Sequence, residues 1–559
     1  MKFWAYPYLF YYLVMFFFWM LAAHRQILFW LYLWQLKEYH LGRFLAHFET
    51  QKGKRLFLNP LFLAKAAVLA FGAVYYFWTQ KVGLFILLAG AVFFLPGLRG
   101  LWGILRRNLI HPELTQKTVF LIGAAHFAVF GSGFVIFGLF LGEMSLIHFA
   151  IAAFCLLAVD ILMPFIVSLI VLGLQPLTIW RKNKILNQAR EIIKSRPELL
   201  VIGITGSYGK SGVKELLTSV LSQEYKVLKT QANQNTEMGV ALTIINNLKP
   251  EHQIFVCEIG AVHKGKITQT ARIVKPKIGI LAGINQQHSG VFGGQQKIID
   301  GKFELPRSLP KDGVAILNFN SPLVRDGFDA KKDQISAQKI IFAGKDIFAS
   351  DIKANAENLS FTFNYQNQKI AINTNAKGAW MADTIILSIA GAIAAGMKLS
   401  GIAQTINQTD FAPFNIKIKS TKVSPMQTYI GGTYANLTII NSTYSANPDG
   451  VMAHLDYLNL WPAKKAIIMP CLIELGKSSK EVHRQIGKKI GEVCDLAIIA
   501  TKDRFGEIKN GAMTAGMPPE NIIFCDNPKK ISELLKTCFS AGNIVLLEGR
   551  LPENIISLF

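Results

Sequence analysis

The residues with the most specific chemical potential form a glycine turn between a short apolar run and a helix-like stretch. From Val201 to Ser211 the sequence reads VIGITGSYGKS, and residues 212–221 follow with helical spacing. The backbone N–H groups of such a turn can surround phosphate oxygens, and the start of the helix adds a favourable dipole. Lys210 would reach the β- and γ-phosphates, and the Ser211 hydroxyl can ligate Mg²⁺. Position 204 is Ile and not the Gly of the common GxxxxGK[ST] spacing, so we interpret the turn as a variant phosphate-binding loop.

An acid, a histidine and a lysine follow this loop in order. Residues 254–257 read IFVC, an apolar strand that ends in Glu258, where a nucleotide-bound Mg²⁺ needs a hard oxygen ligand. His288 follows a second predicted strand at 278–281, and Lys302 lies in the segment DGKFE. Each of these residues, taken alone, is more often structural than catalytic. Their order along the chain therefore carries the argument.

This ordered set of motifs resembles the Mur ligase family. The similarity runs from about residue 198 to residue 559 and rests on TGSYGKS at 205–211, NTEMGV at 235–240, EIGA at 258–261, His288, Lys302, YSANP at 444–448, ELG at 474–476 and His483. The chain is most similar to the branch that joins D-alanyl-D-alanine to a UDP-N-acetylmuramoyl tripeptide. An ordered set of this kind is far more specific than any single motif.

The resemblance implies a fold and a reaction. The fold is α/β, with a central P-loop ATPase domain followed by a C-terminal Rossmann-like domain. In the reaction, ATP phosphorylates a substrate carboxylate, an amine attacks the acyl phosphate, and an amide forms with release of ADP and phosphate. The resemblance therefore implies ATP and Mg²⁺ as cofactors and peptidoglycan precursor synthesis, a step of cell-wall biogenesis, as the process.

The resemblance also implies a role for each matching residue. Lys210, Lys302 and His288 are implied as catalytic, and Ser211, Glu258, His288 and Lys302 as Mg²⁺-binding. Lys302 matches a lysine that family members carbamylate, which turns a cation into a carboxylate-like metal ligand. The implied nucleotide-binding residues are Thr205, Gly206, Ser207, Tyr208, Gly209, Lys210, Ser211, Lys417 and Asn447.

Several positions depart from the family pattern. A Gly-Arg pair after the domain linker is Ile416-Lys417 here, which keeps the charge without the two-pronged geometry of arginine. The other departures are Asn441-Ser442 for an Asp-Asp pair, Asp383 or Thr384 for an adenine-contacting Asn, Trp380 for a common His, and Glu548-Gly549-Arg550 for Lys-Gly-Ser-Arg-Gly. Because the phosphate and Mg²⁺ residues are retained, we expect an active ATP-using enzyme with altered specificity.

The elements that must position these residues begin after residue 180. Short β-branched runs alternate there with helical stretches, which predicts an α/β fold with a largely parallel sheet. The runs lie at 199–204, 254–257, 278–281, 314–317, 466–469, 496–499 and 544–547. Tighter alternation over 338–373 predicts a β-hairpin excursion, and turn residues near 405–425 separate two units. We predict a membrane domain over 1–180, a central ATP-binding domain over 181–410 and a C-terminal domain over 411–559.

The first 175 residues hold the apolar excess of a chain that is 51% hydrophobic and 17% charged. Five runs approach the roughly 20 apolar residues that a spanning helix needs. They lie at 4–23, 57–79, 82–97, 118–141 and 145–174, with 27–34 as a possible sixth. Composition thus predicts about five transmembrane helices, and Asp160 is their one clear acid, either a functional site or a polar contact between helices.

The basic residues of this segment predict its orientation. Lys and Arg concentrate in 24–56, 98–117 and 181–184, which predicts these stretches on the cytoplasmic side and the N-terminus outside. The stretch 35–56 mixes bases with aromatic residues and predicts an amphipathic segment on the inner membrane surface. Basic loops and anionic substrates explain the net charge of +23 without nucleic acid, since no recognition module is present. The six cysteines form no CxxC pair, which argues against a zinc site or a disulfide scaffold.

The sequence as a whole predicts a multi-pass membrane protein with cytoplasmic catalytic domains that form an amide bond. The apolar segment stands where the family carries the domain that grips a UDP-linked precursor, so we expect the carboxylate acceptor to be lipid-linked or UDP-linked. The other partners would be ATP, an amino acid or dipeptide donor, and the membrane. Two alternatives stay open: a polyglutamate-type amino-acid ligase of the same superfamily, and a catalytically impaired, membrane-tethered nucleotide-binding module.

Overall fold

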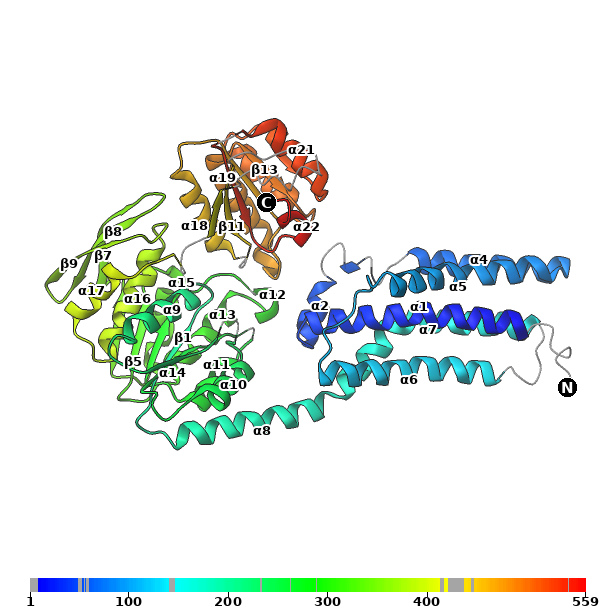
Figure 1. Ribbon diagram of the computed structural model, residues 1–559, viewed down its shortest axis with the longest axis horizontal. Coiled ribbons are helices and arrows are strands. Elements are labelled where there is room, and N and C mark those ends of the chain that lie inside the picture. The colour runs from blue at the N-terminus through cyan, green and yellow to red at the C-terminus, as the bar shows by residue number, and fades with distance from the viewer. Residues whose placement is uncertain are drawn as a thin grey trace. The chain divides into compact units, whose positions relative to one another are not determined.

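The computed structural model divides the chain into two compact units, Met1–Arg181 and Lys182–Phe559. It describes residues 9–48, 53–54, 56, 60–139, 146–231, 234–261, 263–287, 289–412, 417–420, 437–443, 447–540 and 542–559. The first unit is helical, and the second contains two separate β-sheets (Figure 1). The predicted residues His288 and Tyr444–Ala446 lie outside the described ranges.

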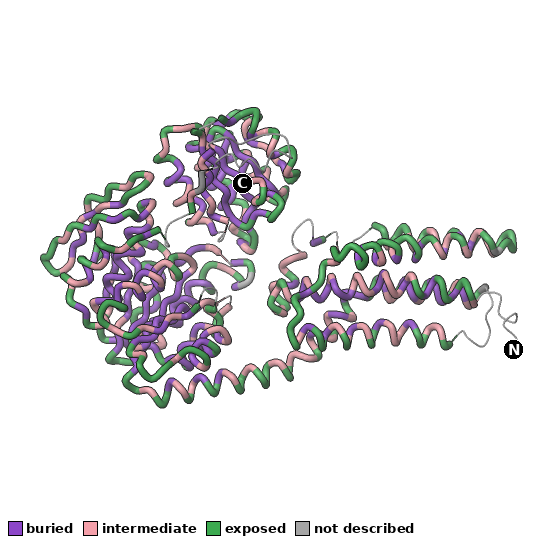
Figure 2. The backbone as a smooth tube through the Cα atoms, in the orientation of Figure 1, coloured by how far each residue is buried: buried purple, intermediate pink, exposed green. Residues whose placement is uncertain are grey.

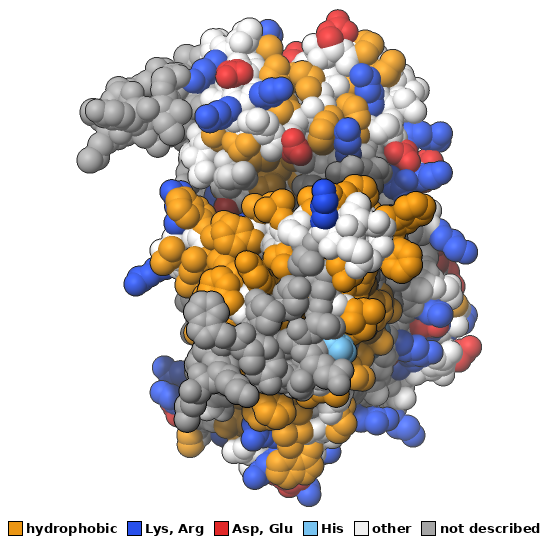
Figure 3. Space-filling model, turned by 90° about the vertical axis from the view of Figure 1, so that its right-hand side faces the viewer, with side chains coloured by type: hydrophobic (Ala, Val, Ile, Leu, Met, Phe, Trp, Pro, Cys, Tyr) orange, Lys and Arg blue, Asp and Glu red, His pale blue; other side chains and the backbone are white. Residues whose placement is uncertain are grey.

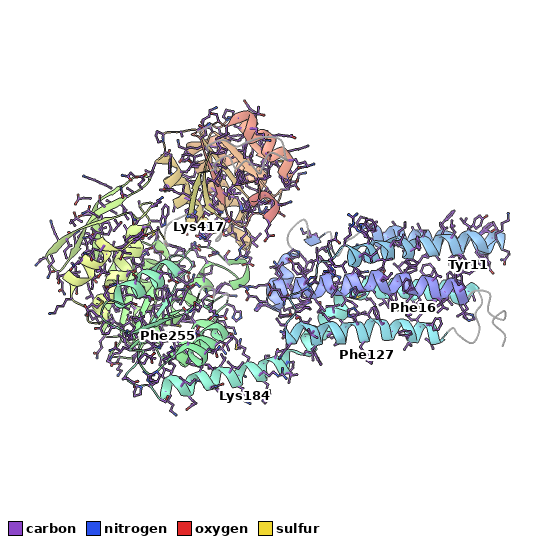
Figure 4. The ribbon with its side chains drawn as sticks, viewed as in Figure 1. Tyr11, Phe16, Phe127, Lys184, Phe255 and Lys417 are labelled. Atoms are coloured by element: carbon purple, nitrogen blue, oxygen red, sulfur yellow. The ribbon has the colours of Figure 1, made fainter. Side chains whose placement is uncertain are left out.

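Long apolar helices build the first unit. They are α1 (Leu9–Leu36), α4 (Pro60–Thr79), α5 (Val82–Leu105), α6 (Gln116–Leu139) and α7 (Leu146–Gly173), with the short α2 (Leu41–His47) after α1. By length and composition, five described helices could cross a membrane. Many residues of these helices are exposed (Figure 2), and hydrophobic side chains lie on the surface in Figure 3. Trp78 and Phe127 are 82% and 84% exposed. Phe127 is labelled on α6 in Figure 4.

Helix α1 differs from its prediction. The part of the run 4–23 that the structure describes, from Leu9 on, and the run 27–34 belong to one helix, so Arg25 lies inside a helix and not in a loop. No Gly or Pro interrupts α1, and His24, between the two runs, finds a partner in His126 on a neighbouring helix, so the helix continues. Helix α5 likewise extends eight residues beyond the predicted run 82–97. Helix α2 covers part of the predicted amphipathic stretch, and its Phe44 stacks on Trp34 at 4.0 Å between ring centroids.

The nine-stranded sheet of the second unit has the strand order β2-β3-β1-β4-β5-β6-β7-β8-β9. Its parallel strands are β1 (Leu200–Thr205), β2 (Val227–Lys229), β3 (Ile254–Glu258), β4 (Ile278–Leu281), β5 (Val314–Asn318) and β6 (Lys339–Ala343). The antiparallel ladder follows, with β7 (Ile347–Ala354), β8 (Leu359–Tyr365) and β9 (Gln368–Thr374). The predicted parallel sheet and the hairpin excursion within 338–373 are both confirmed.

Helices cover both faces of this sheet. One apolar core joins the sheet to α9 (Lys210–Leu221), α16 (Met381–Ala394) and α17 (Leu399–Gln408). A second core on the other face joins it to α8 (Gln175–Lys194), α10 (Glu237–Asn247), α11 (Lys266–Val274) and α14 (Glu304–Arg307). Successive residues of a strand point to opposite faces, so Ile202 and Ile204 enter the first core and Val201 the second.

The six-stranded sheet has the order β10-β11-β15-β12-β13-β14. Its strands are β10 (Lys417–Ser420), β11 (Thr438–Ser442), β12 (Lys465–Met469), β13 (Leu496–Ile499), β14 (Ile522–Phe524) and β15 (Ile544–Glu548), and β10 alone among them pairs antiparallel. Helices α18 (Pro448–Asn459), α19 (Ser479–Val493) and α20 (Phe505–Thr514) pack on one face, and α21 (Pro528–Cys538) and α22 (Glu553–Ile556) on the other. This is a Rossmann-like arrangement, as predicted.

Candidate active site

The glycine turn joins β1 to the start of α9. Gly209 has a φ of 78°, a left-handed conformation that favours glycine, and it is the N-terminal cap residue of the helix. The Ser207 N–H donates to the Gly283 carbonyl at 2.6 Å, which ties the turn to the segment after β4. The Lys210 ammonium folds over the turn and donates to the carbonyls of Gly206 at 2.8 Å and Ser207 at 3.3 Å. The turn therefore presents its lysine and the N-terminus of a helix at one place.

A carboxylate lies directly beside this turn. The Ser211 hydroxyl donates to Glu258 Oε2 at 2.9 Å, and the Asn235 amide donates to Glu258 Oε1 at 2.9 Å. The Glu258 backbone N–H donates to the Thr230 hydroxyl at 3.0 Å, which fixes the end of β3. Glu258 is 3% exposed. The structure thus brings together Ser211 and Glu258, and this pair of hard oxygen donors fits Mg²⁺.

Lys214 is a buried residue of this site that sequence reasoning missed. Its ammonium lies 3.5 Å from Glu258 Oε2 and 3.1 Å from Glu215 Oε1. Lys214 stands one turn after Ser211 on α9, so the i, i+3 spacing on that helix was the available signal. In this arrangement Lys214 neutralises Glu258, and Glu215 gives the ammonium a second partner.

Lys302 ends α13 (Gln295–Lys302) and is 3% exposed. Its ammonium donates to the Ala261 carbonyl at 3.4 Å and lies 5.8 Å from the centroid of the Phe292 ring. Burial, together with the positive charge of Lys210, lowers the pKa of Lys302 to about 7. Burial also lowers the pKa of Lys210, while the charge of Glu258 opposes that shift. The two lysines therefore belong to one electrostatic cluster around the glycine turn.

The segment that follows β4 contacts residues of the C-terminal part of the chain, which forms the six-stranded sheet. Asn447 caps α18, where its Oδ1 accepts from the Gly450 N–H at 3.0 Å and from the Asn285 amide at 3.1 Å. The Ser289 hydroxyl donates to the Leu475 carbonyl, and the Gly290 N–H donates to the Glu474 carbonyl at 2.9 Å. Asn447 of the predicted segment YSANP and Glu474 of the predicted segment ELG thus contact residues before and after position 288 in the sequence.

Two family models match the second unit. The Mur ligase middle domain matches residues 204–392, and the Mur ligase glutamate ligase domain matches residues 426–551. The chain belongs to the Mur ligase family. Members of this family are ATP-dependent ligases, and the predicted family is confirmed.

This Mur ligase is similar to curated enzymes named UDP-N-acetylmuramoyl-tripeptide–D-alanyl-D-alanine ligase. It is 29% identical over 297 residues to that of Haemophilus influenzae and 25% identical over 299 residues to that of Escherichia coli K12. Each alignment covers 52% of this chain and 61% of the relative, so the chain spans less than two thirds of these relatives' length.

Solved structures share its fold. MurF from Acinetobacter baumannii gives a TM-score of 0.58 at 24% identity over 67% of this chain and 80% of that one. MurF from Thermotoga maritima, solved in complex with ADP, gives 0.56 at 23% identity over 67% and 83%. The α/β part of the predicted fold is therefore confirmed.

Two further residues make their contacts within the part of the chain that holds the six-stranded sheet. Lys417, labelled in Figure 4, pairs with Asn441 in the ladder between β10 and β11 and is exposed. His483 accepts from the Leu472 N–H at 2.9 Å through Nε2 and donates to the Ser479 carbonyl at 2.6 Å through Nδ1. Both ring nitrogens of His483, which lies in α19, thus hydrogen-bond backbone groups. His483 therefore fixes the loop that follows β12.

The departures from the family pattern form two small clusters. Asp383 accepts from the Asn320 amide at 2.7 Å and from the Asn318 amide at 3.3 Å, and the Thr384 methyl contacts the position of Gly212 on α9. Asp383 thus lies beside the glycine turn. In the second cluster, His454 Nδ1 lies 2.7 Å from Glu548 Oε2 and 3.0 Å from the Ser442 hydroxyl, with Trp380 edge-on to the His454 ring.

Proposed function

We propose that this chain is a membrane-anchored, ATP-dependent ligase that forms an amide bond through an acyl phosphate and acts on peptides of peptidoglycan precursors. The contact of Ser211 with Glu258 beside the glycine turn carries this proposal, with Lys210 over the turn and the buried Lys302 nearby. Family membership adds the expected chemistry. A carboxylate is a poor acyl donor at neutral pH because oxide is a poor leaving group, and phosphorylation replaces it with a good one.

The residues of the site have separate roles in phosphoryl transfer: some bind phosphate and others bind Mg²⁺. The N–H groups of residues 205–211 and the Lys210 ammonium would bind the β- and γ-phosphates and neutralise charge that develops on the transferred group. Ser211, Glu258, His288 and Lys302 would hold Mg²⁺, which would supply positive charge that neutralises the phosphate oxygens. Asn235 and Thr230 keep Glu258 in place through its side chain and its backbone N–H. We assign nucleotide binding to Thr205, Gly206, Ser207, Tyr208, Gly209, Lys210, Ser211, Lys417 and Asn447.

Lys302 has the properties needed for carbamylation. Because its pKa is about 7, Lys302 is a neutral amine in roughly half of the protein molecules at neutral pH. The amine lone pair can attack CO₂, and loss of a proton then leaves a carbamate anion. This anion would replace a positive charge near Lys210 with a negative one that ligates Mg²⁺.

Removal of CO₂ should therefore lower ATP turnover, and bicarbonate should restore it. Because only the neutral amine reacts, the restoring effect should grow as the pH rises through about 7, the pKa of Lys302. Lys302→Arg keeps the charge but cannot form the carbamate, so its turnover should fall by about a hundredfold and no longer respond to bicarbonate. ADP release at controlled CO₂ measures both effects. A bicarbonate response that survives in Lys302→Arg would contradict the assignment.

We place the catalytic unit in the cytoplasm and the N-terminus outside. With five spans, the stretches 37–59 and 106–115 and the chain after α7 share one side, and they carry most of the bases of the first unit. The carboxylate acceptor in this arrangement is a lipid-linked or UDP-linked peptide precursor, and the donor is an amino acid or dipeptide. The domain ranges 1–180, 181–410 and 411–559 are part of the same proposal.

The amine donor separates the proposed function from its first alternative. Full-length protein in detergent, with ATP and Mg²⁺, should release ADP faster when D-Ala-D-Ala and a muramoyl peptide acceptor are both present. Parallel reactions with lipid-linked and UDP-linked acceptors compare the two acceptor classes. Stimulation by glutamate alone would instead favour the polyglutamate-type ligase. No stimulated turnover with any donor would favour the impaired nucleotide-binding module.

A further inference from the structure

Three consecutive polar residues lie in the middle of α1 and point to three different neighbours. His24 Nδ1 lies 2.8 Å from His126 Nε2 of α6. The Gln26 side chain interacts with Asp160 of α7. Arg25 interacts with Arg99 of α5. Two of these contacts satisfy polar groups, whereas the third brings two positive charges together.

The acid of the bundle is already neutralised. Asp160 is fully buried, accepts from the Trp19 indole N–H at 3.1 Å, and forms an ion pair with Lys65 of α4 at 3.3 Å. It is the only acid in α1, α4, α5, α6 and α7, and the bases of these five helices are Arg25, Lys65, Arg99 and Lys117. Lys117 lies at the start of α6 over the Tyr39 ring. Within the described chain, Arg25 and Arg99 therefore have no carboxylate to pair with.

Close packing of α1 and α5 holds the two arginines near each other. A Cβ added at Gly97 or Gly100 would lie 2.5 or 2.6 Å from backbone oxygens of α1, so only glycine allows this approach. The contacts occur in the same order along both helices, which therefore run parallel. Arg99 adjoins Gly100, and Arg25 lies one turn beyond Leu21, whose carbonyl contacts Gly100.

Both arginines lie in the half of the helices that leads to the basic loops. Arg99 is six residues before the end of α5, or about 9 Å at the helical rise of about 1.5 Å per residue. The residues one turn before and after Arg99 on α5, Leu95 and Trp102, are both apolar and exposed, so Arg99 lies on an apolar outer surface of the helix. A guanidinium at this depth without a partner is costly in a bilayer, and an anion that reaches it must come from the lipid side.

We propose that Arg25 and Arg99 bind the phosphate of a lipid on the side of the basic loops. Guanidinium groups match phosphate oxygens through paired N–H donors, and one phosphate between the two would remove their mutual repulsion. This inference rests on the membrane-spanning arrangement of the proposed function. The phosphate could belong to a phospholipid or to a polyprenyl diphosphate that carries the acceptor, and the lipid preference of the site distinguishes these two sources.

Lipid retention by the full-length protein tests the inference. The protein in neutral detergent is incubated with phosphatidylglycerol, a polyprenyl diphosphate or diacylglycerol, and bound lipid is counted by native mass spectrometry. The wild type should retain the phosphate lipids and not diacylglycerol. Arg25→Gln/Arg99→Gln should retain about tenfold less, because both charged donors are lost. Lys81→Gln, which removes a base before α5 at the other end, is the matched control and should bind as the wild type does.

The source and the fold are checked in the same experiment. Preference for the polyprenyl diphosphate identifies the acceptor's carrier as the ligand, and equal binding identifies phospholipid. Arg99→Gln alone, at an exposed side chain, should lower retention even if the double variant is unstable. Equal phosphate-lipid retention by wild type and these variants overturns the inference. ADP release by the wild type is measured in parallel. Lipid retention without any ADP release would contradict the proposed ligase and leave the lipid site supported.

Discussion

Lys210→Ala should lower ATP turnover by about 10²- to 10³-fold, the effect of removing one charged donor that stabilises a transition state. Lys210 is the first residue of α9, and its ammonium lies over the carbonyls of Gly206 and Ser207. A triphosphate in the turn would offer this ammonium anionic oxygens, and the contact would strengthen as charge develops on the transferred group. The measurement is steady-state ADP release by full-length protein with Mg²⁺ and an amine donor.

Lys398→Ala is the matched control for this prediction. Lys398 precedes α17 on the same unit and is exposed, so its loss removes one positive charge without touching the turn. The control should keep wild-type turnover. If Lys210→Ala turned over ATP as fast as Lys398→Ala, the glycine turn would not be the site of phosphoryl transfer. Thermal unfolding of both variants separates this result from a loss of fold.

Sequence reasoning grouped Ser211 with Glu258, and the structure brings the two into contact because parallel strands align their carboxyl ends. Thr205 and Glu258 end neighbouring strands β1 and β3, and the helix after β1 starts at the same edge of the sheet. The contact between Ser211 and Glu258 follows from that geometry. Lys214 escaped notice because a lysine inside a helix is usually solvated, and its burial depends on Glu215 and Glu258, which lie apart in sequence.

The apolar N-terminal segment was harder to divide into helices from the sequence. The triplet His24-Arg25-Gln26 reads locally as a loop, because polar residues usually end an apolar run. In the structure His24 meets His126 and Gln26 meets Asp160, partners more than 100 positions away. Such contacts keep a helix intact through a polar turn, and no local pattern reveals them. The same limit applies to His483, one of the positions that carry the family resemblance, because only the structure shows that both of its ring nitrogens bind backbone.

Glu258→Gln should raise the Mg²⁺ concentration needed for half-maximal turnover by at least about tenfold and lower the maximal rate by about a hundredfold. The substitution preserves shape but replaces a carboxylate that receives Ser211 and Asn235 at 2.9 Å each. A neutral amide holds a divalent cation weakly, and its NH₂ group cannot accept either of these hydrogen bonds. The readout is ADP release as a function of Mg²⁺ concentration.

Glu215→Gln is the closest control because Lys214 contacts both carboxylates. The Lys214 ammonium lies 3.1 Å from Glu215 and 3.5 Å from Glu258, so each variant leaves it one anionic partner and the fold should persist in both. If Glu258 ligates the metal, only Glu258→Gln should shift the Mg²⁺ dependence. If it serves only to neutralise Lys214, the two variants should behave alike. Equal Mg²⁺ curves would therefore remove Glu258 from the metal site and leave the glycine turn as the only part of the proposed centre still supported by this structure.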